Sequence, residues 1–327
     1  MSSTRRARAV VPLLLPLALV TGALSGCTAT ADGGTDDRPV VLTTFTVLAD
    51  VAQNVAGEHL RVESITKAGA EIHGYEPTPR DVAKASEADL ILDNGLNLEA
   101  WFDQFVESVD VPHVVASDGV EVLDITEDAY AGKPNPHAWM SPVNVQVYVD
   151  NMVDAFSDLD PAHADDFEAN GKAYQKELQE VQDELVDGLS ALPKNERALV
   201  TCEGAFSYLA RDAGLAERYI WPVNAEQQAT PQQIASAIEF VEANDVPAVF
   251  CESTVSDKPM QQVVEATGAE PRELRLLNTE VGLVAFLTLG MDPSRPLAEA
   301  HALASDVEER IRRAHPGFAD VVVHTEP

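Results

Sequence analysis

The chain has 327 residues, with 54 Asp and Glu against 22 Lys and Arg, and a formal net charge of −32. Hydrophobic residues make up 45% and charged residues 23% of the sequence, which is typical of a globular protein and argues against disorder. A surface this acidic repels a phosphate backbone, so we expect no nucleic-acid partner. The length exceeds what one hydrophobic core usually supports and predicts two domains.

The first 26 residues have the pattern of an export signal. Three arginines precede an apolar run over residues 9–20, which is too short to cross a bilayer. The run leads to Leu24-Ser25-Gly26-Cys27, which resembles the lipobox of bacterial lipoproteins. We therefore expect residues 1–26 to be a lipoprotein signal peptide, with Cys27 lipidated and the protein anchored at the outer face of the bacterial cell membrane. Plain secretion with an incidental cysteine is the alternative, and a twin-arginine export route stays open.

Residues 27–38, which begin with the lipidated cysteine, are rich in Gly, Asp and Thr and are predicted to form a flexible tether. Strand-type and helix-type segments then alternate over residues 39–164 and again over 193–327. Between these regions, apolar residues recur at helical spacing over 165–192, which predicts one long amphipathic helix. The expected fold is therefore α/β, with two parallel-sheet lobes bridged by one long helix.

In chain order, the expected strands are 40–45, 61–65, 89–92, 111–116, 198–201, 216–221, 248–251 and 274–277. The expected helices are 48–56, 79–85, 98–106, 165–192, 205–213, 231–243, 259–267 and 297–313.

Residues able to bind a metal follow several of these strands. His73 follows the second strand, His137 lies in a loop next to a proline, and Glu203 and Glu252 follow two strands of the second lobe. In open parallel sheets, ligands bind beyond the carboxyl ends of the strands. Taken singly, a loop histidine is more often a surface residue, and a carboxylate at a strand end is more often a helix cap. The sequence has no close pairs of His or Cys of the zinc-finger type.

Eight segments together resemble a known family. They occur in the family's order: Thr43-Thr44-Phe45, Gly57, His73–Asp81, Ala88-Asp89-Leu90, Asn94–Glu99, Pro136–Pro142, Val200–Phe206 and Glu252–Met260. Over residues 40–277 the chain resembles the metal-binding solute-binding lipoproteins of manganese and zinc ABC importers, a group that includes surface-adhesin lipoproteins. The resemblance implies two α/β lobes rigidly bridged by the long helix, with one metal ion bound in the cleft between them. It also implies capture of this ion outside the cytoplasm and delivery to an ABC permease and its ATPase, without catalysis.

The resemblance also assigns metal ligands. His73 and His137 become the ligands of the first lobe, and Glu203 becomes the third ligand. The family has an aspartate as fourth ligand, in the segment that resembles Leu276–Glu280, and this chain has none there. Glu280 is our choice for the fourth ligand, with the amide oxygen of Asn278 or a water molecule as alternatives. At Glu252 we expect a residue that supports the ligands or joins the lobes.

The expected ligands form a mixed nitrogen and oxygen site. Such a site favours Mn²⁺, with Zn²⁺ and Fe²⁺ as alternatives. Residues 125–135 contain no histidine, so the His-rich loop common in zinc-type relatives is missing. Because imidazole must be neutral to bind, metal affinity is expected to fall below about pH 6.5.

Two cysteines remain besides Cys27. Cys202 and Cys251 each precede a glutamate at the end of a predicted strand. Outside the cytoplasm, a disulfide between them is the leading hypothesis. Soft metal ligands or two buried thiols are the alternatives.

Two other functions stay open. One is a surface lipoprotein for adhesion or assembly that has a degenerate metal site. The other is a metalloenzyme, either an oxygenase with two histidines and one carboxylate or a metal hydrolase with Glu252 as general base. The α/β pattern argues against the oxygenase, whose scaffold is usually rich in β-strands.

Overall fold

A computed structural model describes residues 36–327, except 224–228, 253–254, 273, 280–281, 291–295, 315–317 and 327. The expected signal peptide, Cys27 and Glu280 lie outside the described residues. Within this part of the chain, no helix has the length and apolar character that crossing a bilayer requires.

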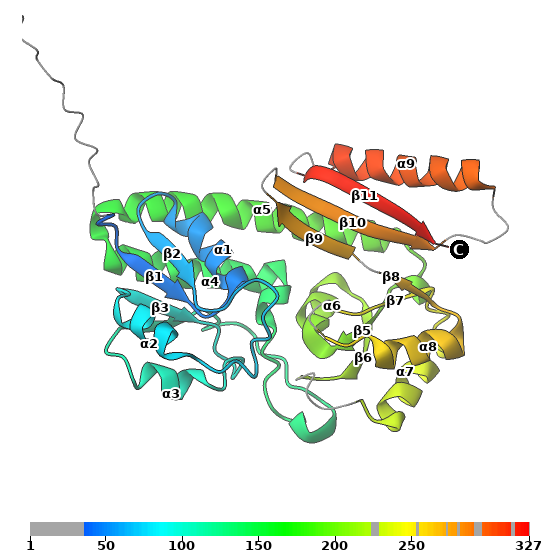
Figure 1. The fold of residues 1–327 in the computed structure, drawn as a ribbon, viewed down its shortest axis with the longest axis horizontal. Coiled ribbons are helices and arrows are strands. Elements are labelled where there is room, and N and C mark those ends of the chain that lie inside the picture. Colours follow the sequence, from blue (N-terminus) through cyan, green and yellow to red (C-terminus); the bar gives the residue numbers. More distant parts are fainter. Residues whose placement is uncertain are drawn as a thin grey trace, which may run out of the picture. The chain divides into compact units, whose positions relative to one another are not determined.

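The first lobe is built on a four-stranded parallel sheet with the strand order β2-β1-β3-β4 (Figure 1). Its strands are β1 (Val40–Thr43), β2 (Arg61–Ser64), β3 (Leu90–Asp93) and β4 (His113–Val115). Successive apolar side chains point to opposite faces: Val41 and Leu92 belong to one core cluster, and Ile91 belongs to another. The sheet therefore has two buried faces, as expected for a parallel sheet.

Helices cover both faces. The helices α1 (Thr46–Ala56), α4 (Pro142–Leu159) and α5 (Ala164–Ser190) share one core cluster with the sheet, and α2 (Pro79–Ser86) and α3 (Phe102–Val106) share the other. The sequence explains where α2 begins, since Thr78 and Asp81 form a capping box and Pro79 occupies the first turn. A capping serine, Ser141, and a first-turn proline, Pro142, begin α4, which our sequence analysis did not predict.

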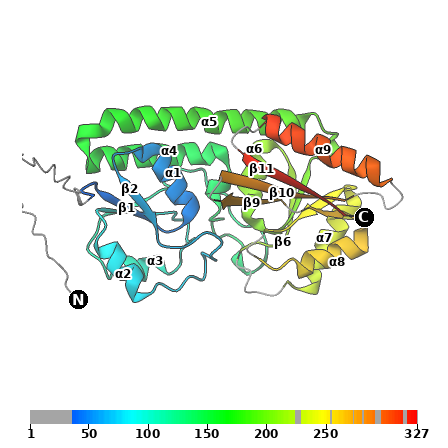
Figure 2. The same cartoon turned by 45° about the horizontal axis from the view of Figure 1, so that its top comes forward.

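The long helix predicted over residues 165–192 is α5, Ala164–Ser190. It packs along α1 and α4 and reaches α6 (Ser207–Ala213) in the second lobe (Figures 1 and 2). Near its far end, Gln182 Nε2 donates a hydrogen bond to the backbone oxygen of Asp212 at 2.9 Å. The helix is therefore in contact with both lobes.

The second lobe contains two parallel strand pairs that share one hydrophobic core with α7 (Pro231–Ala243) and α8 (Lys258–Thr267). The pairs are β5 (Ala198–Glu203) with β6 (Ala216–Trp221), and β7 (Ala248–Phe250) with β8 (Glu270–Arg272). A disulfide between Cys202 in β5 and Cys251 after β7 joins the two pairs, with the Cα atoms 4.9 Å apart. The structure thus has the pairing that the sequence favoured.

The last part of the chain differs from the expected parallel sheet. Its strands β9 (Leu274–Thr279), β10 (Gly282–Gly290) and β11 (Phe318–Glu326) form a sheet of their own, against which α9 (Leu297–Ala314) packs. β9 and β10 are antiparallel, whereas β10 and β11 are parallel. The reason is the connection length, because a parallel crossover needs a dozen or more residues and only two separate β9 from β10. The sequence analysis predicted β9 and α9 in this region and did not predict β10 and β11.

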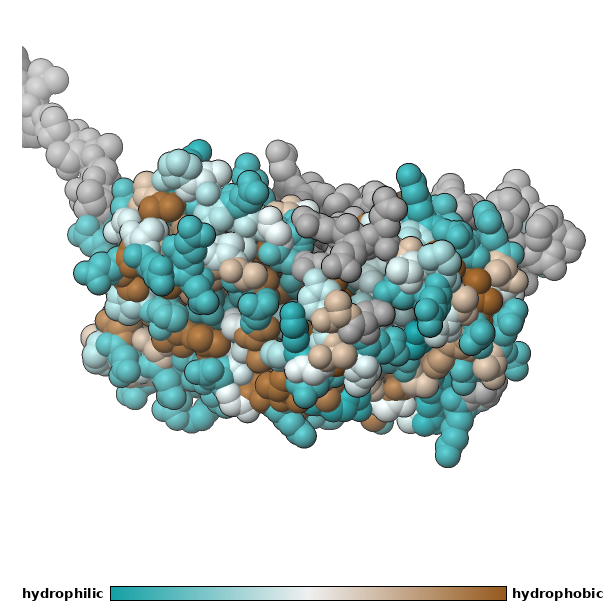
Figure 3. Space-filling view, turned by 90° about the horizontal axis from the view of Figure 1, so that it is seen from below, coloured by the Kyte–Doolittle hydropathy of each residue, from teal (hydrophilic) through white to brown (hydrophobic). Residues whose placement is uncertain are grey.

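Hydrophilic side chains cover most of the face drawn in Figure 3, with smaller apolar patches between them. This surface agrees with the excess of acidic residues in the sequence.

The first lobe holds a buried carboxyl group, Glu99, whose exposed fraction is 5%. Its Oε1 accepts hydrogen bonds from Thr44 Oγ1 at 2.6 Å and from the backbone nitrogen of Asn94 at 2.9 Å. Burial raises the pKa of Glu99 to about 7, although these hydrogen bonds act in the opposite direction. Between about pH 4.5 and 7 the folded protein therefore holds a proton that the unfolded chain has released, and stability falls as the pH rises.

We predict that Glu99→Gln removes this contribution because glutamine does not ionise. The free energy of unfolding is measured by urea denaturation at pH 5 and at pH 8. The difference between the variant and the unmodified protein should change by about 2 kcal/mol in favour of the variant as the pH rises. Glu184→Gln, on the exposed surface of α5, is the control and should run parallel to the unmodified protein. A Glu99→Gln curve parallel to that of the unmodified protein would contradict the prediction.

The disulfide gives a second prediction. With Cys27 replaced by alanine, Cys202 and Cys251 are the two cysteines left in the chain. Thiol labelling under denaturing conditions should find none without reductant and two after reduction. The Cys202→Ala/Cys251→Ala variant should lose about 2–4 kcal/mol of stability, because the bridge joins residues 49 apart in sequence. Two reactive thiols before reduction would show that the bridge is absent.

Candidate metal centre

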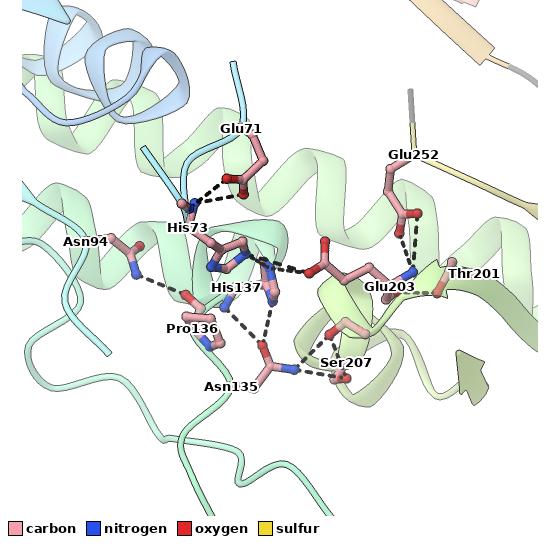
Figure 4. Close-up of polar contacts among 12 residues, drawn as sticks. Glu71, His73, Asn94, Asn135, Pro136, His137, Thr201, Glu203, Ser207 and Glu252 are labelled. Carbon is pink, nitrogen blue, oxygen red and sulfur yellow. Dashed lines mark hydrogen bonds and ion pairs between the residues drawn. The ribbon is translucent and has the colours of Figure 1, made fainter. Parts of the chain in front are cut away.

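Three side chains from distant parts of the chain meet between the lobes (Figure 4). His73 Nε2 lies 3.2 Å from His137 Nε2, and Glu203 Oε1 lies 3.7 Å from the first nitrogen and 4.0 Å from the second. The exposed fractions of these side chains are 11%, 4% and 10%. The structure thus brings together three of the four residues that the resemblance assigned as ligands.

His73 lies in the loop that follows β2. The carboxylate of Glu71 accepts hydrogen bonds from the backbone nitrogens of His73 and Gly74, at 2.9 and 2.7 Å, which fixes the turn. The indole Nε1 of Trp101 donates to the backbone oxygen of Ile72 at 3.0 Å. The His73 ring also makes a hydrogen bond to the backbone of Leu98 that favours the protonated form, so the ring is the donor in this bond.

His137 lies in the loop before α4 and is held by Asn135. The Oδ1 atom of Asn135 accepts from the backbone nitrogen of His137 at 3.0 Å and from its Nδ1 at 2.9 Å. Because Oδ1 is an acceptor, the proton of the neutral imidazole is on Nδ1 and Nε2 carries a lone pair. The backbone of the loop is held as well, since Asn94 Nδ2 donates to the oxygen of Pro136 at 2.9 Å.

Glu203 is the last residue of β5, at the carboxyl end of the strand. The next residue is a glycine for steric reasons, because a Cβ atom on Gly204 would lie 2.9 Å from the backbone oxygen of Pro222. Both carboxylate oxygens of Glu252 accept from the backbone nitrogen of Glu203, at 3.3 Å each (Figure 4). Glu252 therefore supports the strand end that carries Glu203, which is the kind of role expected from the sequence.

The electrostatics of the cluster favour a bound cation. Burial lowers the pKa of His73, against the opposing effects of Glu71 and Leu98, and burial together with nearby His73 lowers the pKa of His137 well below its usual range. Both rings are therefore neutral at pH 7, and their contacts with Glu203 are not ion pairs. The two histidines therefore become protonated at a lower pH than an ordinary histidine. The sequence-based expectation for the loss of metal affinity rested on that ordinary value.

The distances also suit one ion. Nitrogen and oxygen ligands about 2.1 Å from a metal lie about 3.0–3.4 Å apart at coordination angles of 90–109°. The two Nε2 atoms are within this range, and the contacts of Glu203 are a few tenths of an ångström longer. Two imidazole nitrogens and one carboxylate oxygen thus surround a position that a divalent cation fits.

The other candidate residues are elsewhere. Glu280 lies outside the described residues, and Asn278 belongs to β9. The sulfur atoms of Cys202 and Cys251 are bonded to each other, which excludes the alternative of soft metal ligands in this form of the protein. The role of Asn135 was missed by the sequence analysis, although an asparagine two residues before a loop histidine is a typical local hydrogen-bonding motif.

A cavity of about 320 Å³ borders the cluster on the side of His73. Its lining includes Leu96, Asn97, Tyr130 and Lys133. Open space therefore lies next to His73, one of the candidate ligands.

Comparisons with known proteins identify the family of the chain. Residues 41–285 match the family model described as the periplasmic component A of the zinc-uptake complex. The iron-binding protein YfeA of Yersinia pestis is 53% identical over 231 residues, which cover 70% of this chain and 74% of that protein. The manganese ABC transporter substrate-binding lipoprotein PsaA of Streptococcus pneumoniae is 37% identical, with 77% and 84% covered.

Solved structures are similar too. A manganese-bound periplasmic metal-binding protein from Candidatus Liberibacter asiaticus has a TM-score of 0.67 and 33% identity, over 72% of this chain and 87% of that chain. The laminin-binding protein Lmb of Streptococcus agalactiae, described as having adhesin and metal-transporting activity, has a TM-score of 0.66 and 29% identity, over 72% and 89%.

A second family model matches the C-terminal part. Residues 273–327, which contain β9, β10, α9 and β11, are similar to the cytoplasmic domain of cation efflux proteins. The two matches overlap over residues 273–285, the region in which the sequence lacks the expected aspartate. The larger match covers most of the chain, and the chain therefore belongs to the zinc-uptake component A family, the substrate-binding proteins of metal ABC importers.

Proposed function

We propose that the protein captures one divalent transition metal ion outside the cytoplasm through His73, His137 and Glu203, and delivers it to an ABC permease with its ATPase. The observation that carries this proposal is the convergence of two neutral imidazole nitrogens and one carboxylate oxygen within 4.0 Å of one another. The two histidines come from the first lobe and the glutamate from the second, so a bound ion links the lobes.

We propose manganese as the cargo, with ferrous iron as the main alternative. A carboxylate oxygen makes the site harder than an all-histidine or thiolate site, which suits both ions. The names of the relatives support this choice, because one is an iron-binding protein and the other a manganese transporter component. Zinc competes at such sites by its general affinity, so selectivity has to be measured.

For the fourth ligand we retain Glu280, with Asn278 and water as the alternatives. Support comes from the sequence alone, because Glu280 follows β9 in the segment that resembles the family's aspartate-bearing region. Replacing Glu280 with glutamine and titrating metal tests this choice: weaker binding supports Glu280, and unchanged binding leaves Asn278 or water.

Contacts between the lobes support a restricted motion on metal binding. Ser141 Oγ donates to Asp212 Oδ2, and the Arg211 guanidinium donates to the backbone oxygen of Glu121 at 3.2 Å. With the contact of Gln182 to the same Asp212, these hydrogen bonds tie α6 to the start of α4, to α5 and to the first-lobe segment at Glu121. We propose that release of the ion involves the ligand loops and strand ends, with little movement about α5.

We also propose that Cys27 carries the lipid anchor. Support comes from the Leu24-Ser25-Gly26-Cys27 segment and from the lipoprotein names of several relatives. A catalytic role is not part of the proposal, because the Glu252 carboxylate, the candidate general base, accepts hydrogen bonds from the backbone of Glu203.

Adhesion is the second candidate function, favoured by the similarity to Lmb. The geometry of the cluster supports an intact metal site and thereby argues against a protein whose site has degenerated. Metal binding and adhesion are compatible, as the description of Lmb states for that protein.

Calorimetric titration of the metal-free protein tests the main proposal. We expect one manganese or ferrous ion to bind per chain, and Glu203→Gln to weaken binding by about a hundredfold or more, because it removes the anionic ligand with little change of shape. Glu63→Gln, in β2 and paired with Lys84, is the control and should bind like the unmodified protein. If manganese, ferrous iron and zinc all fail to bind, the proposal is refuted. Tight binding of zinc with weak binding of manganese would identify zinc as the cargo instead.

Fractionation of cells tests the anchor. The unmodified protein should be found with membranes, and Cys27→Ala should be released or retain its leader, because acyl chains are needed for stable anchoring. Mass spectrometry of the mature N-terminus should show the acyl groups on Cys27. An unmodified cysteine would leave plain secretion as the explanation.

A further inference from the structure

We infer that Asn135 is a positioning residue that couples the metal ligands of the two lobes through one side-chain amide. This inference rests on the proposed metal site and adds a residue that fixes how the ligands meet. Asn135 is 3% exposed and lies in the part of the first lobe between β4 and α4.

The acceptor end of the amide holds the first lobe's ligand. Oδ1 accepts from the backbone nitrogen and from Nδ1 of His137, at 3.0 and 2.9 Å. These two bonds fix the ring orientation and keep the imidazole proton on Nδ1. The lone pair of Nε2 is thereby directed toward His73 and Glu203 (Figure 4).

The donor end of the same amide holds the second lobe. Nδ2 donates to the backbone oxygen of Gly204 at 2.8 Å and to Ser207 Oγ at 3.3 Å. Gly204 directly follows Glu203, so this bond fixes the strand end from which the third ligand projects. Glu252 holds the backbone nitrogen of Glu203, and Asn135 holds the oxygen of the next residue.

The two ends depend on each other. An amide has one acceptor end and one donor end, so two sets of contacts together determine which way the group faces: the backbone N–H of His137 on one side, and the acceptors of the second lobe, Gly204 and Ser207, on the other. With Oδ1 facing His137, the tautomer of that ring is set. If the Gly204 oxygen moves away, the amide loses one of the contacts that orient it, and its hold on the His137 ring weakens.

The backbone of Asn135 is fixed independently of its side chain. Its oxygen accepts from the phenol of Tyr208 in α6 at 2.7 Å, and its nitrogen donates to the oxygen of Leu123 at 2.7 Å. The same phenol oxygen accepts from the backbone nitrogen of Leu123 at 3.2 Å. A substitution of the side chain thus leaves three backbone contacts of the loop in place.

Two variants distinguish the contribution of the acceptor end of the amide from that of its donor end. Asn135→Leu keeps the branched arrangement of the side-chain heavy atoms and removes both the acceptor and the donors. Asn135→Asp keeps an acceptor for His137 and places a carboxylate oxygen against the Gly204 oxygen, where a donor is needed. Asn151→Leu is the matched control, because Asn151 Nδ2 also donates to two backbone oxygens, of Ala116 and Asp118, at 2.8 and 2.9 Å.

The first readout is the tautomer of His137 in the metal-free protein, measured from the ¹⁵N shifts of its imidazole. The unmodified protein, Asn135→Asp and Asn151→Leu should show a protonated Nδ1 and a bare Nε2. Asn135→Leu should show a mixture of the two tautomers. A purely structural role for Asn135 predicts no change in this signal, and an unchanged tautomer in Asn135→Leu would overturn the inference.

The second readout is manganese affinity by calorimetry. Asn135→Leu should bind manganese at least about tenfold more weakly than the unmodified protein, as is typical when a group that orients a ligand is removed. Asn135→Asp should also bind more weakly, because it loses the bond to Gly204, and Asn151→Leu should be unchanged. Asn135→Asp binding like the unmodified protein would overturn the coupling to the second lobe. If the unmodified protein binds no metal, the proposed function fails, whereas the tautomer measurement still tests the role of Asn135.

Discussion

The site depends on the close approach of two imidazole nitrogens and one carboxylate oxygen. The two nitrogens are 3.2 Å apart, the oxygen lies 3.7 and 4.0 Å from them, and all three side chains are largely shielded from water. Such an arrangement is unfavourable unless the surrounding protein holds each group in place or a cation binds between them. The hydrogen bonds of Glu71, Asn135 and Glu252 provide that support, and the metal ion would provide the compensating charge.

Much of this could be predicted from the sequence. The strands of the first lobe, the long helix and the pairing of Cys202 with Cys251 follow from periodicity, composition and compartment. His73, His137 and Glu203 were assigned by resemblance, and the structure brings them together. The residues were recognisable because ligand loops at strand ends carry short motifs whose order along the chain is preserved.

Other features could not be predicted, for physical reasons. The contact of Asn135 with Gly204 joins residues 69 apart, and no local pattern records which carbonyl an amide will face. The pKa of Glu99 depends on burial in the folded lobe and is invisible in the sequence. The antiparallel pair β9 and β10 was missed because the sequence analysis placed a strand at 274–277 and none at 282–290, so it expected no pairing between them. The expected fourth ligand falls in this same region, where resemblance to one family gives way to resemblance to another.

The order of the site residues along the chain has a consequence for variation of the sequence. His73, Asn135, His137 and Glu203 all precede the C-terminal sheet formed by β9, β10 and β11, which has a hydrogen-bonded ladder of its own. A change confined to the chain downstream of Glu252 would therefore leave the imidazoles, the carboxylate and their supports in place. The similarity to the cytoplasmic domain of cation efflux proteins covers residues 273–327, which lie entirely in that part of the chain.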